Sequence, residues 1–124
     1  ENVMLPLELA GHEQARKMAR ALIDKVGLAK RWSHYPAQLS GGEKQRVAIA
    51  RAFATEPAVL FADEPTGNLD STTGANIMEL MFELNRSSST TLILVTHDTK
   101  LAERCDRVLA LDAGRLVSDS GVAA

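Results

Sequence analysis

The sequence predicts an α/β fold, with helices in the first part of the chain and parallel strands in the second. Apolar residues before position 56 recur at the spacing of amphipathic helices. After position 57, two short continuous apolar runs flank a helical pattern, which is typical of a strand, helix, strand unit. We therefore expect a helical subdomain over residues 1–56 and part of an α/β core over residues 57–124.

Length and composition favour one soluble globular domain or a piece of a larger one. The chain has 124 residues, of which 45% are hydrophobic and 24% charged, and its formal net charge is -2. Disordered chains are less apolar and more charged, and this near-neutral balance gives no electrostatic footprint for nucleic acid. Cys105 is the only cysteine, which excludes an internal disulfide and fits a reducing compartment. No apolar run approaches the roughly 20 residues that span a bilayer.

Two amphipathic helices are expected before position 56. The first covers residues 15–26, with apolar positions at i, i+3, i+4, i+7, i+8 and i+11, and Gly27 follows in the usual C′ place. The second covers residues 40–54 and opens with Ser40 and Glu43 in the S-x-x-E spacing of a capping box. Between the two helices the periodic pattern lapses, so a connecting segment is expected there.

The second half should alternate strands and helices. Residues 58–62 and 91–96 are continuous apolar runs, which predicts strands buried on both faces. The segment between them has helical spacing on one side, at Ile77, Leu80, Met81 and Leu84. This order implies a right-handed parallel crossover. A short helix over about 98–105 and a hairpin with strands at 108–111 and 116–117 should follow.

Two acidic residues at the end of the first strand require compensation. An ionised carboxylate that leaves a sheet edge needs a cation or hydrogen bonds, and Mg²⁺ with a polyphosphate would suit Asp63 as metal holder and Glu64 as base. His97 follows the second strand and should lie at the same sheet edge. The structural alternatives are a strand-end turn for the acids and a capping role for His97. Gly67 and Asp70 could likewise be ordinary turn residues.

The start of the second helix is a candidate anion site. Ser40, Gly41 and Gly42 present a hydroxyl, free backbone N–H groups and the positive end of the helix dipole. The alternative is an ordinary N-cap with a flexible lead-in. Farther along this helix, Arg46 and Arg51 are expected at the surface or in ion pairs.

Four motifs in this order resemble those of ATP-binding cassette (ABC) ATPases. Residues 39–52 resemble the signature motif, and residues 59–65 resemble the Walker B strand. Residues 67–70 resemble the D-loop, and residues 96–98 resemble the switch-histidine loop. The match spans almost the whole chain. It implies a P-loop NTPase fold in which a helical subdomain adjoins the Walker B half of a mostly parallel sheet.

The resemblance implies roles for individual residues. Asp63 would be the carboxylate associated with Mg²⁺, Glu64 the base that polarises the attacking water, and His97 the contact to the γ-phosphate of ATP. Asp70 would help to couple two sites across a dimer interface. The signature residues would complete the site of the opposite subunit: Ser40, Gly41, Gly42 and Glu43.

The resemblance also implies a biological role, that of the ATP-binding subunit of a transporter. Such subunits dimerise and couple ATP hydrolysis to an integral-membrane permease, at the cytoplasmic face of the bacterial inner membrane. The opening residues 1–7 and the stretch 63–70 look most like the ATPases of lipoprotein-release and macrolide-export type permeases. Departures from the family pattern are mild: Glu43 and Lys44 stand in the signature where Gln is commoner, and Asn68 replaces Ala.

One family motif is missing. The phosphate-cradling loop G-x-x-x-x-G-K-[ST] does not occur, since no glycine is followed by Lys-Ser or Lys-Thr. The chain therefore looks like the C-terminal half of a cassette without the Q-loop, and we expect it to be inactive and poorly stable alone. In the family, the missing strand lies between those at 91–95 and 108–111, which predicts a gap in the sheet and unpaired apolar edges.

Two other functions stay open. The C-terminal head lobe of a chromosome-maintenance or DNA-repair ATPase also carries these motifs without the phosphate loop. It should have a long coiled coil before the signature, whereas residues 1–39 predict one short helix and a loop. A non-catalytic regulatory half-domain is the second alternative, and the intact Asp63, Glu64 and His97 argue against it.

Overall fold

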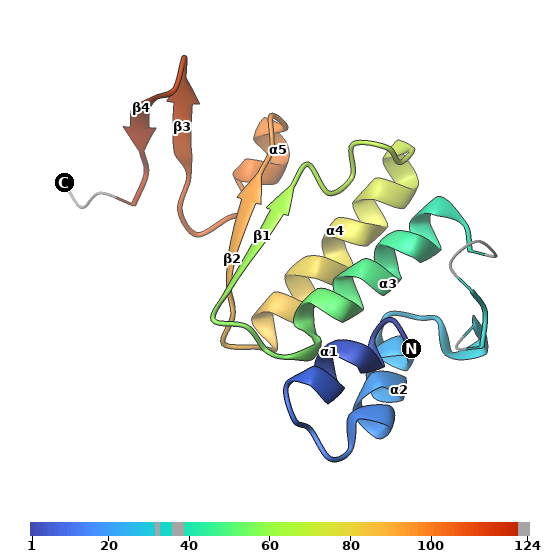
Figure 1. Cartoon of the computed structure of the whole chain (residues 1–124). Helices are drawn as coiled ribbons and strands as arrows, with labels where there is room; N and C mark the ends of the chain where they lie inside the picture. Colours follow the sequence, from blue (N-terminus) through green and yellow to red (C-terminus); the bar gives the residue numbers. More distant parts are fainter. Residues whose placement is uncertain (32, 36–38, 122–124) are drawn as a thin grey trace.

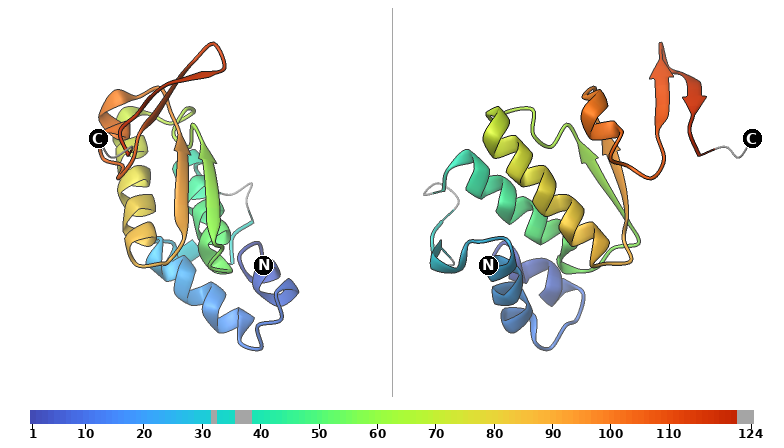
Figure 2. Two further views of the ribbon diagram at one scale, coloured as in Figure 1. Left: turned by 90° about the vertical axis from the view of Figure 1, so that its left-hand side faces the viewer. Right: turned by 180° about the vertical axis from the view of Figure 1, so that it is seen from behind.

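The computed structural model describes residues 1–31, 33–35 and 39–121 (Figure 1). In chain order the elements are α1 (Met4–Leu9), α2 (Ala15–Lys25), the 3₁₀ helix η1 (Ala29–Arg31), α3 (Gly41–Ala54), β1 (Val59–Asp63), α4 (Ser71–Arg86), β2 (Thr91–Val95), α5 (Thr99–Ala102), β3 (Leu109–Asp112) and β4 (Arg115–Asp119). Helices α3 and α4 run side by side next to β1 and β2, and the β3–β4 hairpin stands away from them in Figure 1 and in the right-hand view of Figure 2.

The two helices predicted before position 56 are confirmed, together with their caps. Gly27 follows α2 with φ at 81°, and the Oγ of Ser40 accepts a hydrogen bond from the N–H of Glu43 at 3.2 Å. The carboxylate of Glu43 accepts in return from the N–H of Ser40 at 3.0 Å, which completes the capping box. Helix α1 was not predicted, because it is only 6 residues long and contains a proline. Pro6 is tolerated because it lies in the first turn, where its missing N–H has no intrahelical partner.

One apolar core joins the helices to the inner face of the β1–β2 sheet. Its most deeply buried large side chains, at 0–1% exposure, are Val3, Leu7, Val26 and Ile77. The predicted apolar side of α4 is confirmed, since Ile77, Leu80, Met81 and Leu84 are all buried. The first two helices therefore pack into the same core as α4, the helix between β1 and β2.

The strands form two separate sheets. β1 and β2 pair in parallel, as predicted, and Asp63 lies opposite Val95. β3 and β4 pair antiparallel. The hairpin turn has Ala113 and Gly114 at φ 48° and 75°, which suits a two-residue turn between twisted strands. β2 and β3 do not pair, so the gap expected between them is present. Helix α5 was predicted over about 98–105 and is shorter in the structure, where it ends at Ala102.

The prediction that both strands are buried on two faces is wrong. The inner face packs on the core through Leu60, Ala62, Leu92 and Leu94. The outer face is exposed at Val59 (47%), Phe61 (71%), Ile93 (40%) and Val95 (50%). A continuous apolar run indicates that a strand can be covered on both sides, but it does not supply the second covering layer. Among the described residues, no element fills that place.

The exposed outer face should make residues 1–124 prone to self-association when expressed alone. We expect this chain to bind an environment-sensitive dye such as ANS and to unfold without a sharp transition. Phe61→Ser should reduce dye binding, whereas Leu9→Ser, which changes an exposed leucine on α1, should not. Cooperative unfolding of the unmodified chain as a monomer would contradict this expectation.

Candidate active site

The structure brings Glu64 and His97 into contact. β1 and β2 end side by side, and the N–H of Glu64 continues their ladder by donating to the carbonyl of Val95 at 2.9 Å. One carboxylate oxygen of Glu64, Oε1, lies 2.6 Å from His97 Nδ1 and accepts from the His97 N–H at 3.1 Å. The side chains are 92% exposed for His97 and 39% for Glu64, so the pair is open to a ligand.

The backbone at Glu64 is strained. Its φ of 45° lies in the left-handed region, which costs a residue other than glycine about 1–3 kcal/mol. The N–H of Gly67 donates to the Glu64 carbonyl at 3.0 Å, which closes the turn. Gln45 on α3 donates from Nε2 to the carbonyl of Pro65 at 2.7 Å. Gln45 could not be predicted from the sequence, because no local pattern links positions 20 residues apart.

Asp63 is the last residue of β1 and is exposed. Among the described residues, no group of three His, Cys, Asp or Glu side chains could hold a metal ion by itself. Mg²⁺ does not require such a cage, since it commonly retains water and binds one or two carboxylates together with substrate phosphates. The donor chemistry at this strand end therefore fits Mg²⁺ held with a phosphate ligand.

The N-terminus of α3 retains free donors. The capping box uses the N–H groups of Ser40 and Glu43, whereas those of Gly41 and Gly42 have no acceptor within the described part of the chain. These two N–H groups and the helix dipole can bind an anion. No described hydrogen bond joins this terminus to Glu64, so the structure does not bring the two predicted groups into one network within a single chain.

Gly42 also has a packing role, which the sequence did not indicate. A Cβ at this position would lie 2.7 Å from Cγ2 of Thr73 at the start of α4, a distance at which the Thr73 side chain or one of the two helices must shift. A Cβ at Gly41 would meet Leu69 Cδ2 at an ordinary 3.6 Å. The first glycine is therefore free of packing constraint, whereas the second lets α3 and α4 approach each other closely.

Gly42→Ala should destabilise the protein through this contact. Overpacking costs typically about 1–3 kcal/mol, of which better helix propensity returns up to about 1 kcal/mol. Thr73→Ser removes the Cγ2 methyl and keeps the hydroxyl, so the double variant should recover most of the loss. Thermal denaturation of the full gene product, meaning everything encoded by the reading frame around residues 1–124, measures both effects. A double variant no more stable than Gly42→Ala would contradict the assignment.

Asp70 is the N-cap of α4. Its side chain accepts from the N–H of Thr73 at 3.2 Å, and hydrogen bonds from the Thr73 hydroxyl and N–H hold the pKa of Asp70 below its usual range. The carboxyl group is therefore ionised at neutral pH. The sequence also allowed Asp70 to be an ordinary turn residue, and in the structure it has a local structural role as the cap of α4.

The segment after His97 is fixed to α4. Asp98 Oδ1 accepts from the N–H groups of Lys100 and Leu101 at 3.0 and 3.4 Å and so caps α5. Beyond this helix, Arg104 pairs with Glu79 at 2.6 Å, and its guanidinium lies 4.5 Å from the ring centroid of Phe82. These contacts attach the segment that follows His97 to α4, while the β1–β2 ladder holds the end of β2 beside β1.

The expectation that Arg46 lies at the surface or in an ion pair is wrong. It is half-buried rather than a surface or ion-pair group, and Nη1 donates to the carbonyl of Val26 at 3.0 Å. That carbonyl lies at the C-cap of α2, where helices leave acceptors without partners. Arg46 therefore joins α3 to α2, and the neighbouring Gln45 joins α3 to the turn that follows Glu64.

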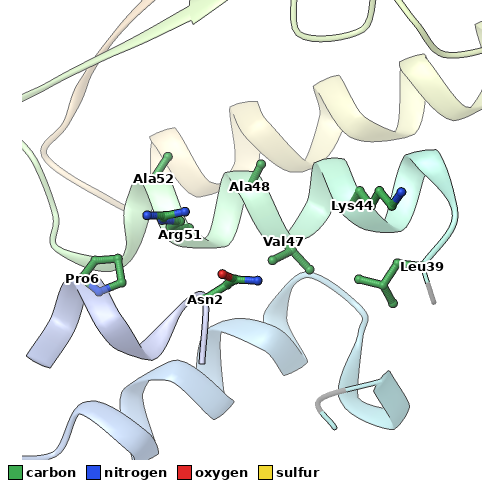
Figure 3. A pocket seen from close by; sticks show the side chains of 8 residues that line it. All are labelled: Asn2, Pro6, Leu39, Lys44, Val47, Ala48, Arg51 and Ala52. Atoms are coloured by element: carbon green, nitrogen blue, oxygen red, sulfur yellow. The ribbon is translucent and has the colours of Figure 1, made fainter. Parts of the chain in front are cut away.

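A hollow of about 550 Å³ lies between α1 and α3 (Figure 3). It is lined by Asn2, Pro6, Leu39, Lys44, Val47, Ala48, Arg51 and Ala52. None of the predicted site residues lines it. The candidate site is therefore the open edge of the sheet at Glu64 and His97, separate from this hollow.

Comparison with known proteins decides the family. The sequence profile described as "ABC transporter" matches residues 1–67, more than half of the chain. The chain belongs to the ABC transporter family. The resemblance found in the four motifs is thereby confirmed, and two of them, the signature and the Walker B strand, lie inside the matched range.

Curated ABC relatives match nearly all of the chain. YbbA of Escherichia coli (strain K12), named an uncharacterized ABC transporter ATP-binding protein, is 59% identical over 122 residues, which are 97% of this chain and 54% of YbbA. LolD of Legionella pneumophila (strain Paris), a lipoprotein-releasing system ATP-binding protein, is 54% identical over 118 residues, 94% of this chain and 52% of LolD. The chain thus spans about half the length of the curated relatives it matches.

Solved ABC structures confirm the fold. The dimeric structure of MJ0796, described as a bacterial ABC transporter cassette, matches with a TM-score of 0.77 at 42% identity. The match covers 96% of this chain and 54% of the MJ0796 chain. A post-hydrolysis dimer of MJ0796 bound to ADP and Pi matches with a TM-score of 0.75 at 41% identity. The fold is therefore part of an ABC ATPase cassette, in agreement with the sequence prediction.

The comparisons also bear on the alternatives. The relatives named above are ABC transporter ATP-binding proteins, which favours the transporter reading over the head lobe of a DNA-repair ATPase. That lobe should carry a long coiled coil before the signature, whereas α1 and α2 have only 6 and 11 residues. Within the described ranges, no helix is long and apolar enough to traverse a bilayer.

Proposed function

We propose that this chain supplies the Walker B, signature and switch-histidine parts of an ATP-hydrolysing ABC subunit. The contact between Glu64 and His97, at 2.6 Å on the open sheet edge, carries the proposal. A carboxylate at that edge can take a proton from a water molecule, and a histidine held against it can orient the phosphate that the water attacks. The described part of the chain contains no other carboxylate and histidine in hydrogen-bond contact.

Glu64 acts in this proposal as the base that polarises the attacking water. An ionised carboxylate can only accept hydrogen bonds, so the His97 Nδ1 that faces it carries a proton. The other ring nitrogen of His97, Nε2, is left to contact a γ-phosphate oxygen. Asp63 is the residue that would hold Mg²⁺, through water. Bound Mg²⁺ neutralises charge that develops on the phosphate oxygens during transfer.

We also propose that the signature residues act on ATP bound by a second subunit. The free N–H groups of Gly41 and Gly42 form an anion site, and no described hydrogen bond connects them to the Glu64 site of the same chain. A two-fold dimer would place this terminus of each subunit on the nucleotide of the other. Ser40 and Glu43 would shape that site through the capping box, and Asp70 would lie near the interface. The dimeric state of the MJ0796 cassette supports this arrangement.

The membrane partner is proposed from the relatives. LolD is named the ATP-binding protein of a lipoprotein-releasing system, and YbbA is named an ABC transporter ATP-binding protein. We infer that the complete subunit binds an integral-membrane permease at the cytoplasmic face of the inner membrane. Export or lipoprotein release is the kind of transport that these relatives suggest.

Steady-state hydrolysis of Mg-ATP tests the enzymatic proposal. We expect the full gene product to turn over and residues 1–124 alone to be inactive, because the phosphate-cradling loop is not among these residues. A chimera in which residues 1–124 replace the matching part of E. coli YbbA gives the same test in a protein of known length. Glu64-dependent turnover by residues 1–124 alone would contradict the incomplete site. Inactivity of both longer proteins would contradict the proposed function.

A further inference from the structure

We infer that Gln45 is a positioning residue for Glu64, which links the signature helix to the turn that holds the catalytic base. The inference rests on the proposed function and adds a positioning residue to the same site. Gln45 Nε2 donates to the carbonyl of Pro65 at 2.7 Å, and Gln45 is partly buried. Pro65 directly follows Glu64, so this bond fixes the backbone one residue from the proposed base.

The backbone at this point depends on its surroundings. Glu64 has a φ of 45°, a conformation that persists only where neighbouring groups enforce it. The Val95 carbonyl holds Glu64 from the sheet side, at 2.9 Å from the Glu64 nitrogen. Gln45 holds the following peptide from the helix side. The backbone that carries the Glu64 side chain is therefore held jointly by the sheet and by α3, while His97 contacts the carboxylate itself.

One face of α3 contacts the segment between β1 and α4 at two points. Gly41 and Gln45 are four residues apart and so lie on one side of the helix. Gly41 faces Leu69, with 3.6 Å between a built Cβ and Leu69 Cδ2, and Gln45 bonds to Pro65. An anion that binds the N–H groups at Gly41 and shifts α3 would move Gln45 with it.

The test is a substitution series in the full gene product. Gln45→Leu keeps the size of the side chain and removes the donor, whereas Gln45→Lys keeps a donor that can reach a carbonyl. We expect Gln45→Leu to lower kcat about tenfold with KM for ATP changed less than about twofold, because misplacing a catalytic group impairs chemistry more than binding. Gln45→Lys should recover most of the loss. Gln14→Leu, the same change at an exposed position, is the control.

A double-variant comparison separates positioning from a merely structural role. If Gln45 acts through Glu64, Gln45→Leu should cause no further loss of kcat in a Glu64→Gln background. Equal kcat for Gln45→Leu and the parent, or a full additional loss in the Glu64→Gln background, would overturn the inference and leave the proposed function intact. Absence of any Glu64-dependent hydrolysis by the parent would overturn the proposed function and this inference together.

Discussion

Glu64→Gln should lower kcat for ATP hydrolysis about a thousandfold, since general-base catalysis contributes about 10²–10⁴-fold. Glutamine has nearly the same shape and can still accept the hydrogen bond that Glu64 receives from the His97 N–H at 3.1 Å. The turn should therefore keep its conformation while the proton acceptor is lost. Steady-state assays of the full gene product measure kcat. The equilibrium dissociation constant for ATP should stay within about threefold of the parent.

Glu56→Gln is the matched control for this variant. Glu56 is also a glutamate with positive φ, 48°, and it is exposed just before the same strand. Its substitution should leave kcat within about twofold of the parent, as is usual for surface changes. A Glu64→Gln protein with kcat within about tenfold of the parent would contradict the assignment of the base.

Gly41→Asp should cause the second-largest loss, at least about a hundredfold in kcat, which is the usual cost of losing an oxyanion donor. The new carboxylate would repel the phosphate that the free N–H groups at the start of α3 are proposed to bind. It should not unfold the protein, because a built Cβ at Gly41 makes only an ordinary 3.6 Å contact with Leu69. An acid in the first turn of a helix is instead stabilising by about 0.3–1 kcal/mol.

The combination of lost activity and unchanged or raised thermal stability distinguishes this effect from misfolding. Gly41→Asn adds the same bulk without the charge and should retain at least about tenfold more activity than Gly41→Asp. Equal losses for the two variants would show that bulk, and not charge, is responsible. In that case the anion site at α3 would have to be abandoned.

The sequence predicted the elements whose signals are local. The capping box of Ser40 and Glu43, the glycine after α2 and the hairpin turn within residues 112–115 each depend on neighbouring residues, and each is present. Helix α1 escaped prediction because six residues with a proline have no measurable periodicity. The exposure of Phe61 could not be predicted either, since a strand sequence does not reveal which layers cover it.

The candidate site was predictable only in part. Parallel strands that end together place Glu64 beside His97, so that contact follows from the order of the elements. Gln45 and Arg46 bond to carbonyls 20 residues away, and a backbone carbonyl leaves no mark on the sequence. The packing of Gly42 against Thr73 is likewise a tertiary contact. Through Gly42, Gln45 and Arg46, α3 contacts α4, the turn after β1 and the end of α2.

The central claim is that this chain contributes to two different sites of a dimer, through Glu64 to one and through Gly41 to the other. Mixing Glu64→Gln and Gly41→Asp subunits of the full gene product tests it most directly. Each variant alone should be inactive, whereas in a mixed dimer one of the two sites combines an intact base with an intact signature. An equal mixture of freely exchanging subunits should therefore regain about one quarter of the parental ATPase activity, because half of the dimers are mixed. No recovery in a mixture shown to contain mixed dimers would contradict the claim.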